Sequence, residues 1–438
     1  MKTKTLFISL AIYAIAITLS FSQDNQVYHV NINRLTESFN KLKSFSDPNT
    51  KGNQRVAFSD YNVEALHWLK SKLTAMGLET TIDYAGNLVA KRKGLDNNLP
   101  PIGFGSHIDC VPNGGHYDGQ VGVLGGLEVL EFLDEHKIVT KHPLEFIVFS
   151  NEEGILLGSR SLAGALKNEA LDIINTTGYT NAEGMDRLGG NSKKVFDLKR
   201  EKESFHAFVE LHIEQGGVLD EKGLDIGVVQ GIVGIRWWDV TVTGFSNHAG
   251  TTPMNKRQDA MLAAAEFTLA VNEIVKSIPG TQVGTVGRIQ AFPGVPNVIP
   301  GKVVLSLELR DLSDDKLDML IDKIKMKTED IGEQFGTSFL FAPISATAKP
   351  ALTSNTIKDA IEKESNELGY TSLRMPSGAG HDTQDMDLLG PIGMIFIPSK
   401  GGISHSPEEF STFEQMAEGT NVLLNTILSL DKTNIISD

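Results

Sequence analysis

The sequence has little cysteine and a shortage of positive charge. Cys110 is the single cysteine among 438 residues, so a fold held by intramolecular disulfides is excluded. The 40 lysine and arginine residues are outnumbered by 55 aspartate and glutamate residues, which gives a formal charge of −15. A nucleic-acid-binding protein is expected to carry a basic surface, so we expect no nucleic-acid partner. The sequence also lacks low-complexity tracts and repeats, which excludes fibrous and disordered proteins.

Long hydrophobic runs are absent except at the N-terminus. Lys2 and Lys4 precede an apolar run over residues 6–21, and small residues suited to cleavage follow up to Ser22. This layout is typical of a secretory signal peptide, predicted here at residues 1–22, and it indicates an exported protein, periplasmic or secreted. An uncleaved membrane anchor is the alternative, because the run approaches the roughly 17 residues needed to span a bilayer. After cleavage we expect no membrane association.

Strand-like and helix-like segments alternate along the chain from about residue 60. The predicted elements are helices over residues 63–76 and 122–133 and strands over residues 102–105, 144–149, 207–211 and 392–397. Such alternation is typical of an α/β fold, in which a parallel or mixed sheet is covered by helices.

The middle of the chain has a different order of elements. Its predicted strands and helices cover residues 237–243, 259–278, 285–289, 303–309, 317–335 and 338–341. The resulting order, β-α-β-β-α-β, is that of the split βαβ sandwich. We therefore predict a small domain at residues 230–345, inserted into a larger domain formed by residues 23–229 and 346–438.

Side chains that can bind a metal follow four apolar strands. They are His107 with Asp109, Glu152 with Glu153, His212 with Glu214, and His405 in a glycine-rich loop. In open α/β sheets, ligands bind beyond the carboxyl ends of the strands, so these distant residues are expected to meet there. A single histidine at a strand end is more often structural, but four such places together favour one shared site.

Asp118 lies in a turn between Gly115 and Gly119. The glycines would let the backbone bring its carboxylate close to the site, although a polar turn is the simpler interpretation. A carboxylate has two oxygens and can bridge two cations about 3.5–4 Å apart. Histidine and carboxylate ligands with almost no thiol suit zinc, manganese or cobalt.

Glu152 and Glu153 are adjacent carboxylates that follow a strand. They cannot both point the same way, so one can bind a metal while the other stays free as a general base. A metal lowers the pKa of its water towards about 7, and a nearby carboxylate can then take the proton. A solvent-exposed acidic turn is the alternative.

With these residues assembled, the sequence resembles the hydantoinase/carbamoylase family of dinuclear-metal amidohydrolases. That family includes N-carbamoyl-L-amino-acid hydrolases, allantoate amidohydrolases and β-ureidopropionases, and it is related to zinc aminoacylases and carboxypeptidases. The matching segments are residues 105–109, 117–119, 151–154, 212–216, 247–254, 296–301, 310–311 and 377–382. The resemblance implies a zinc-exopeptidase-like catalytic domain and an inserted domain that acts as a lid and forms a homodimer.

The resemblance also implies roles for individual residues. Two divalent metal ions, zinc in the first place and otherwise manganese or cobalt, would share Asp118 as a bridging ligand. The remaining ligands would be His107 and His212 for one metal, and Glu153 and His405 for the other. Glu152 would be the general base, and Asp109 would orient the imidazole of His107.

Substrate-binding residues follow in the same way. They would be Gln215, Asn297, Arg310, Gly378, Ala379 and His381. Arg310 and Asn297 would hold a substrate carboxylate, because a guanidinium group can donate two parallel hydrogen bonds. His248 would reach across the dimer and stabilise the oxyanion. Without the resemblance, we would expect Arg310 to form an ion pair at the surface. His248 and His381 would then be interpreted as polar loop residues.

The implied reaction is hydrolysis of the ureido C–N bond of N-carbamoyl amino acids or allantoate, with release of ammonia. An exported aminoacylase or dipeptidase with the same dinuclear site is the alternative, and an exported binding protein without turnover is a rival from another class. His212 favours ureido substrates, because many peptidase relatives have a carboxylate there. The segment after Gly154 is shorter than in many relatives, so the pocket wall beside the metals, and with it the substrate preference, can differ from theirs. We expect Cys110 to be buried and inert.

Overall fold

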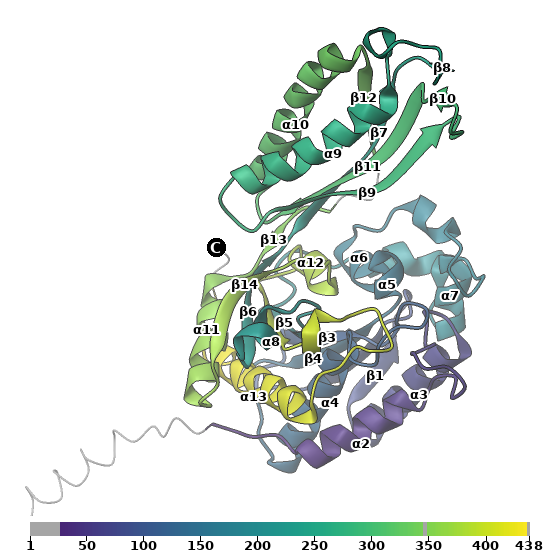
Figure 1. Cartoon of the computed structure of the whole chain (residues 1–438). Helices are drawn as coiled ribbons and strands as arrows, with labels where there is room; N and C mark the ends of the chain where they lie inside the picture. Colours follow the sequence, from purple (N-terminus) through teal and green to yellow (C-terminus); the bar gives the residue numbers. More distant parts are fainter. Residues whose placement is uncertain (1–26, 345–347, 436–438) are drawn as a thin grey trace, which may run out of the picture.

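The structure, a computed structural model, describes residues 27–344 and 348–435 (Figure 1). The predicted signal peptide at residues 1–22 therefore lies outside the described residues. The described residues form a large mixed sheet, a smaller four-stranded antiparallel sheet that rises from it, and a two-stranded antiparallel sheet near the end of the smaller one (Figure 1). None of the described helices is long and apolar enough to cross a membrane.

The large sheet has nine strands within the described residues. In spatial order they are β1 (Glu79–Ile82), β2 (Leu88–Arg92), β4 (Leu144–Phe149), β3 (Ile102–His107), β5 (Ala207–Ile213), β15 (Ile392–Ile397), β6 (Ile226–Ile232) and β13 (Ala351–Leu352), with β14 (Ser372–Ser377) beside β6. The central strands β4, β3, β5 and β15 run parallel to one another. Their carboxyl ends consequently lie along one edge of the sheet, where polar side chains from distant parts of the chain can meet.

Helices cover both faces of this sheet. They are α2 (Ile32–Lys43), α3 (Asp60–Ala75), α4 (Gln120–Glu135), α5 (Glu152–Ile155), α6 (Leu157–Ala163), α7 (Asn181–Leu188), α8 (Val218–Lys222), α11 (Asn355–Glu367), α12 (Asp382–Met386) and α13 (Phe413–Leu430), with 3₁₀ turns η1 (Asn168–Asp172), η2 (Ser192–Leu198) and η4 (Lys400–Gly402). The α4 helix is buried along most of its length and lies directly on β5, because a Cβ at Gly122 would come within 2.2 Å of the Leu211 carbonyl oxygen. This close packing fixes the start of α4, and with it the preceding turn that carries Asp118.

The smaller sheet forms the inserted domain, residues 234–343. Its elements are β7 (Gly234–Thr243), β8 (Asn247–His248), η3 (Met254–Lys256), α9 (Ala260–Ser277), β9 (Val283–Phe292), β10 (Val298–Ile299), β11 (Lys302–Asp311), α10 (Asp314–Phe335) and β12 (Ser338–Pro343). The main strands are antiparallel in the order β12-β7-β11-β9, and side chains of α9 and α10 pack on them to form a separate hydrophobic core. The β-α-β-β-α-β order predicted from the sequence is therefore confirmed, as is the α/β fold with a mixed sheet.

The start of the insertion differs from the predicted residue 230. Strand β6 continues to Ile232 within the large sheet, where it pairs with β13 and β14. Strand β7 begins at Gly234, so Val233 alone separates two strands that belong to different sheets. On the return crossing, Ala348 forms a bridge with Ile235. The two crossings are thus hydrogen-bonded to each other, which gives the inserted domain a paired, strand-like attachment.

Candidate metal centre

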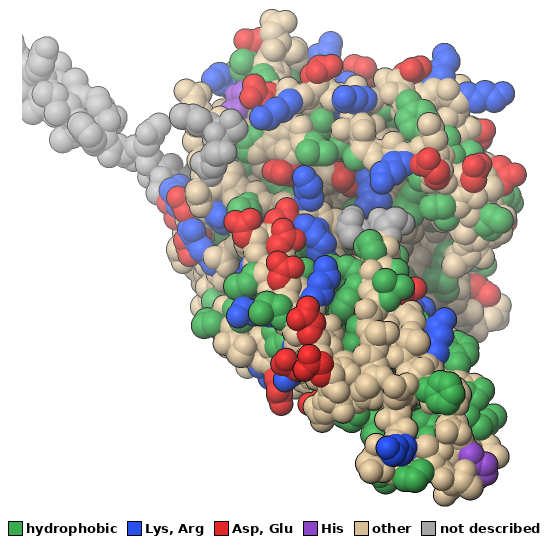
Figure 2. Space-filling model, turned by 90° about the horizontal axis from the view of Figure 1, so that it is seen from above, with side chains coloured by type: hydrophobic (Ala, Val, Ile, Leu, Met, Phe, Trp, Pro, Cys, Tyr) green, Lys and Arg blue, Asp and Glu red, His purple; other side chains and the backbone are tan. Residues whose placement is uncertain are grey.

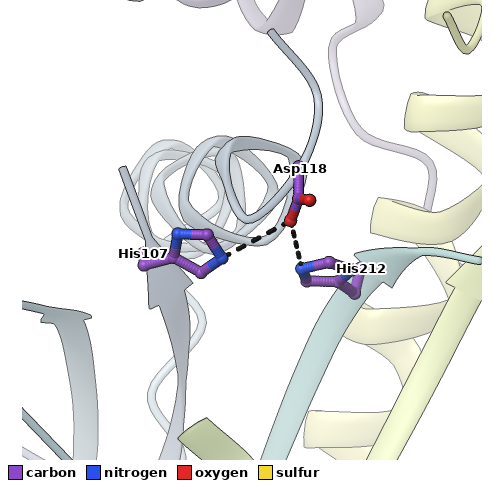
Figure 3. Close-up of side chains that lie close together, drawn as sticks. All are labelled: His107, Asp118 and His212. Atoms are coloured by element: carbon purple, nitrogen blue, oxygen red, sulfur yellow. Dashed lines mark ion pairs between the residues drawn. The ribbon is translucent and has the colours of Figure 1, made fainter. Parts of the chain in front are cut away.

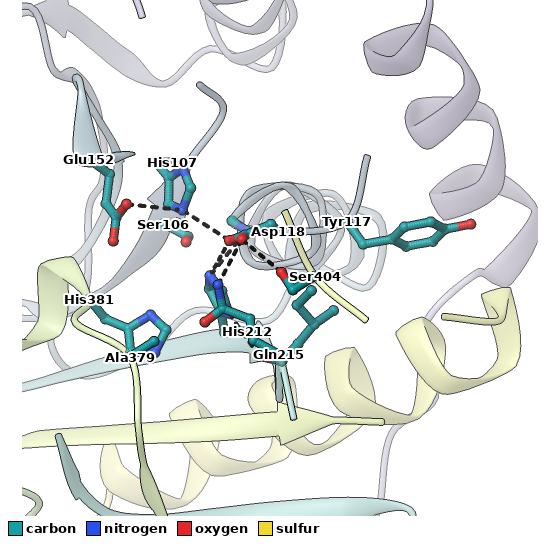
Figure 4. Close-up of polar contacts among 12 residues, drawn as sticks. Ser106, His107, Tyr117, Asp118, Glu152, His212, Gln215, Ala379, His381 and Ser404 are labelled. Atoms are coloured by element: carbon teal, nitrogen blue, oxygen red, sulfur yellow. Dashed lines mark hydrogen bonds and ion pairs between the residues drawn. The ribbon is translucent and has the colours of Figure 1, made fainter. Parts of the chain in front are cut away.

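The predicted metal ligands meet at the carboxyl edge of the large sheet. Figure 4 shows three of them, His107, Asp118 and His212. His107 ends β3, His212 is the last residue but one of β5, and Glu153 lies in α5 directly after β4. The described residues contain two groups around Asp118 that could hold a cation: His107, Asp118 and His212, and Asp118, Glu153 and His405. We call them the inner and the outer cluster, because the first is fully buried and His405 of the second is half-exposed.

In the inner cluster, two imidazoles face the same carboxylate oxygen (Figure 3). The Nε2 atoms of His107 and His212 lie 3.5 and 3.1 Å from Asp118 Oδ1. Each Nδ1 lies beside a backbone carbonyl oxygen, at 3.0 Å for His107 and 2.9 Å for His212, which assigns the proton to Nδ1. Both Nε2 atoms therefore carry the lone pair that ligation requires; that of His212 also accepts from the Gly119 backbone nitrogen, at 3.1 Å.

An unpartnered nitrogen tests whether a metal fits here. His107 Nε2 is buried and has no hydrogen-bond partner among the described residues. It faces Asp118 at 3.5 Å and Glu152 at 3.7 Å, two groups that only accept hydrogen bonds when they are ionised. A cation held by His107 Nε2 and Asp118 would give this nitrogen a partner, so the residues fit a metal ion.

The outer cluster uses the second oxygen of the shared carboxylate. Asp118 Oδ2 lies 3.0 Å from His405 Nε2, which in turn lies 3.5 Å from Glu153 Oε2. The Gln215 amide nitrogen also donates to Asp118 Oδ2, at 2.7 Å. Each oxygen of Asp118 thus belongs to a different cluster, which is the arrangement of a bridging ligand.

Opposing electrostatic effects act on these groups. Burial, together with the charges of Asp382 and the neighbouring carboxylates, raises the pKa of Glu152 well above its ordinary value. Burial and the charge of Asp118 raise the pKa of Glu153 to about 7. For Asp118, burial acts in the same direction, but the three histidines that face it, His107, His212 and His405, hold its pKa well below the usual range. Several buried carboxylates therefore compete for few positive charges, and cations would relieve that competition.

Gly119 shows why the turn before α4 is rich in glycine. Its φ is +67°, and a Cβ there would lie 2.3 Å from His107 Nε2. A side chain would therefore be strained and would also displace the imidazole. This explains how the backbone brings Asp118 so close to the ends of β3 and β5.

The two adjacent glutamates contact different neighbours. Glu152 Oε2 approaches His107 of the inner cluster, whereas Glu153 Oε2 approaches His405 of the outer cluster. The Asp109 carboxylate accepts hydrogen bonds from the backbone nitrogens of both glutamates, at 3.4 and 3.2 Å. Asp109 therefore anchors the first turn of α5 and fixes where the two glutamates start.

Asp109 also contacts the His107 imidazole that it was expected to orient, but through its main chain. The nearest carboxylate oxygen lies 3.9 Å from His107 Nδ1, beyond hydrogen-bonding distance. The backbone carbonyl of the same residue is the partner, at 3.0 Å. Sequence spacing identified the residue but could not distinguish its main chain from its side chain.

Several predicted substrate residues border the clusters. The His381 ring lies edge-to-face with His212, with ring centroids 4.5 Å apart, and its Nε2 is 2.9 Å from Ser377 Oγ. Arg310, on β11 of the inserted domain, donates from Nη1 to the Gly378 carbonyl at 2.6 Å and from Nε to Glu308 at 2.7 Å. Figure 4 also shows Gln215 and Ala379 beside the histidines. Both domains therefore contribute to this region.

His248 and Asn297 are not brought to the clusters within one chain. His248 is exposed in β8, and β8 pairs with β10, which begins directly after Asn297. Both strands lie at the end of the inserted domain away from the large sheet (Figure 1). Arg310 lies near the opposite end of β11, roughly 27 Å from Lys302 at about 3.4 Å per residue. The sheet therefore separates Asn297 from Arg310 within one chain, and the expectation that these two residues hold one substrate carboxylate stays a prediction.

The structure adds buried carboxylates that the sequence analysis missed. Glu409 accepts hydrogen bonds from Asp118 N and Ser404 Oγ, and Glu210 accepts from Ser106 Oγ and Thr383 Oγ1. Glu210 could have been noticed as a charge within the apolar run of β5. Glu409 gives no such signal, because its surroundings in the sequence resemble a solvent-exposed acidic turn.

Two other residues are explained without ligation. Glu214 accepts from the backbone nitrogens of Val218 and Leu219, at 2.7 and 2.8 Å, and so caps α8. Cys110 is buried as expected, and burial raises the pKa of its thiol to about 12, which disfavours the reactive thiolate.

The short connection after Gly154 leads directly from α5 into α6. Leu156 links the two helices with a φ of +56°. It lines a cavity of about 850 Å³ together with Arg160, Gln384 and Ala348. The effect of this connection on substrate preference stays a prediction.

Residues 103–429 match the family described as Peptidase family M20/M25/M40. The chain belongs to this family of metal-dependent hydrolases. It is 38% identical over 402 residues to an N-carbamoyl-L-amino acid amidohydrolase of Geobacillus stearothermophilus, covering 91% of this chain and 98% of that one. It is 37% identical over 411 residues to a ureidoglycolate hydrolase of Arabidopsis thaliana, covering 91% and 86% of the two chains.

Solved structures agree with these relatives. A hydantoinase/carbamoylase family amidase from Burkholderia multivorans superimposes with a TM-score of 0.85 and 32% identity, covering 93% of this chain and 99% of that one. The resemblance inferred from the motifs is therefore confirmed. An aminopeptidase from Bacillus cereus, at 18% identity and a TM-score of 0.64, shares the fold alone.

Proposed function

We propose that this protein is a metal-dependent amidohydrolase that cleaves the ureido C–N bond of an N-carbamoyl amino acid or of allantoate and releases ammonia. The observation that carries the proposal is the pair of clusters sharing Asp118, with the buried carboxylate of Glu152 beside the inner one. The names of the relatives support the substrate class, since they include N-carbamoyl-L-amino-acid amidohydrolases and an allantoate deiminase.

We further propose two divalent cations, one for each cluster. His107, Asp118 and His212 would hold the first, and Asp118, Glu153 and His405 the second. Nitrogen and oxygen donors without a thiol suit zinc in the first place, and otherwise manganese or cobalt. When bound, such ions polarise a carbonyl group and make water more acidic.

Glu152 is suited to proton transfer. Its side chain is only 9% exposed, and its raised pKa favours uptake of a proton. We assign it the proton from the attacking water, which it then delivers to the leaving nitrogen. For a carbamoyl substrate the products are ammonia, carbon dioxide and an amino acid.

Arg310 supplies the positive charge for a substrate carboxylate. Its Nε and Nη1 already donate to Glu308 and to the Gly378 carbonyl, which orients the guanidinium plane between the two domains. The remaining N–H groups can donate to two carboxylate oxygens. Arg310 pairs with Ile235 beside the attachment of the inserted domain, so it can bind the carboxylate before this domain closes over the substrate and excludes water.

We also propose a homodimer formed through the inserted domain. Strand β9 is an edge of its sheet, and exposed apolar side chains lie on it and on α9, among them Ile289 (52% exposed) and Leu269 (59% exposed). Apolar side chains are visible between the charged ones in Figure 2. An unpaired strand edge next to apolar surface favours association. A dimer would also give His248 and Asn297, remote from the clusters of their own chain, a site in the partner.

Mixing two inactive variants tests this arrangement. Glu152→Gln and His248→Ala each damage a different half of the site. If His248 acts in the partner's site, a mixed dimer contains one intact site, and statistical exchange would restore roughly a quarter of wild-type activity. No restoration, with subunit exchange shown by light scattering and mass spectrometry, would place His248 outside the partner's site.

Export of the chain is a separate proposal, supported by the layout of residues 1–22 alone. Mass spectrometry of the protein recovered from its native cells would show the N-terminus after Ser22. An intact Met1 in a membrane fraction would favour the uncleaved anchor.

The first experiment for the activity is a substrate panel. Metal-depleted protein is given zinc, manganese or cobalt and then allantoate, N-carbamoyl-L-amino acids or 3-ureidopropionate, with ammonia release followed. N-acetyl amino acids and dipeptides, followed by amine release, form the comparison set. We expect metal-dependent ammonia release from at least one ureido compound. Cleavage confined to acyl or peptide bonds would overturn the proposed substrate class.

A further inference from the structure

The outer cluster depends on two loops that are far apart in the sequence. Asp118 lies in the turn before α4, whereas His405 lies in the loop between β15 and α13. The contact between them, 3.0 Å from Asp118 Oδ2 to His405 Nε2, joins the two loops at the site. The side chain of His405 is 49% exposed and its φ is +54°, so neither burial nor regular structure holds it in place. Another group must fix this geometry.

Glu409 contacts both loops with one carboxylate. Its Oε1 accepts hydrogen bonds from the backbone nitrogens of Tyr117 and Asp118, at 2.9 and 3.1 Å. Its Oε2 accepts from Ser404 Oγ and from the His405 backbone nitrogen, at 2.9 and 3.3 Å. Each oxygen thus serves one loop, and the carboxylate spans the gap between them.

The surroundings leave Glu409 little freedom. The residue is 5% exposed, and a Cβ at Gly115 would come within 2.0 Å of its Oε1. The glycine therefore makes room for this carboxylate. A buried carboxylate is costly unless donors compensate its charge, and here four donors do so. The group is not part of either candidate cation cluster, so it acts on the site through the residues that it holds.

We propose that Glu409 is a positioning residue of the outer cluster: it sets the separation of Asp118 and His405 and thereby the affinity of that cluster for its cation. The inference rests on the proposed function, because it takes the two clusters as cation sites. Asp118 belongs to both clusters, but the packing of α4 on β5 also fixes the turn that carries it, and His107 and His212 are held by β3 and β5. Loss of the Glu409 contacts should therefore act mainly on His405 and the outer cluster.

A matched pair of variants tests the proposal. Glu409→Gln keeps the size of the side chain but replaces one acceptor oxygen by an NH₂ group that faces N–H or O–H donors. Glu408→Gln makes the same chemical change at the adjacent, exposed residue, which pairs with Lys51 at the surface. Full-length apoprotein of each variant is titrated with cobalt and with zinc, and the two dissociation constants are measured by absorption and by competition with a chelator.

We expect Glu409→Gln to weaken the second equivalent of metal by about tenfold to a hundredfold, the range for partners of ligating residues. The first equivalent should stay within about threefold, and Glu408→Gln should match the wild type at both sites. A merely structural role would weaken both equivalents alike. Equal weakening, or no change at the second site, would overturn the role of Glu409.

Glu409→Asp keeps the test decisive if the glutamine variant does not fold. This variant retains both acceptors but is one methylene shorter, so it can serve one loop better than the other. Its second-site affinity should lie between those of the wild type and Glu409→Gln, with the first site unchanged. A wild-type protein that binds fewer than two equivalents would instead overturn the two-cation proposal, and the role of Glu409 with it.

Discussion

Replacement of Glu152 by glutamine separates proton transfer from metal binding. Within the described residues, the Glu152 carboxylate makes one close polar contact, at 3.7 Å from His107 Nε2. The amide has nearly the same shape, so no hydrogen bond is lost and packing is retained. Removal of one buried negative charge also relieves repulsion with Asp382, Glu153 and Asp118. We therefore expect unchanged or slightly higher thermal stability and unchanged metal content.

The expected loss of rate follows from the role of the base. A positioned general base contributes typically about 10²–10⁴-fold. At about 1.36 kcal/mol for each factor of ten, this range corresponds to roughly 3–5 kcal/mol of activation free energy. For Glu152→Gln we expect kcat to fall about 1,000-fold, with KM within about threefold. Ammonia release measures kcat and KM, and elemental analysis of the purified protein measures metal content.

Glu153→Gln is the matched control for this experiment. Glu153 lies next to Glu152 and shares its burial, but its Oε2 approaches His405 rather than His107. This variant should lose metal from the outer cluster, and added metal should recover part of its activity. If Glu152→Gln retains turnover within tenfold of the wild type, or loses metal as Glu153→Gln does, the assignment of Glu152 as the base is wrong.

Three further outcomes are expected. Arg310→Lys should raise KM about tenfold to a hundredfold, because charge-assisted hydrogen bonds contribute about 1.5–3 kcal/mol, whereas Arg288→Lys on exposed β9 should leave KM unchanged. Removal of metal with a chelator should abolish activity and lower the melting temperature, since a cation at about 1,000 times its Kd stabilises the fold by about 4 kcal/mol. Burial and the neighbouring His142 lower the pKa of His206, so the fold favours its neutral form. The stability that this provides is complete above the unfolded pKa and is lost as the pH falls below about 6.5, so His206→Gln should flatten the slope of unfolding free energy between about pH 7 and 5.

The central strands could be predicted from the sequence because they are buried on both faces. Such strands are continuous apolar runs, and β4 and β15 occupy the predicted residues. The same logic placed the metal-binding side chains, since parallel strands end at one edge of the sheet. The boundary at β6 could not be predicted in this way. One residue separates β6 from β7, and the change of sheet leaves no mark on the hydrophobic pattern.

What the sequence left open at the site has a common physical origin. Sequence separation does not say how far apart two residues lie when a long strand intervenes. Asn297 and Arg310 are close in the sequence, but β11 carries Arg310 to the other end of the inserted sheet. Glu409 is the opposite case, since a residue far along the chain from Asp118 contacts its backbone.

The position of Arg310 links the fold to the chemistry. The inserted domain joins the large sheet through two crossings that pair at Ile235 and Ala348. Arg310 pairs with Ile235 across β11 and β7, so it lies beside this attachment and moves least when the domain swings. The far end, with His248, moves most. A swing about the crossings would therefore leave the Arg310 contact with Gly378 in place while it carries His248 through a wide arc. Binding of the carboxylate by Arg310 should thus precede arrival of the oxyanion donor His248. Stopped-flow fluorescence of Trp237 and Trp238 would report this order as a slow step after substrate binding.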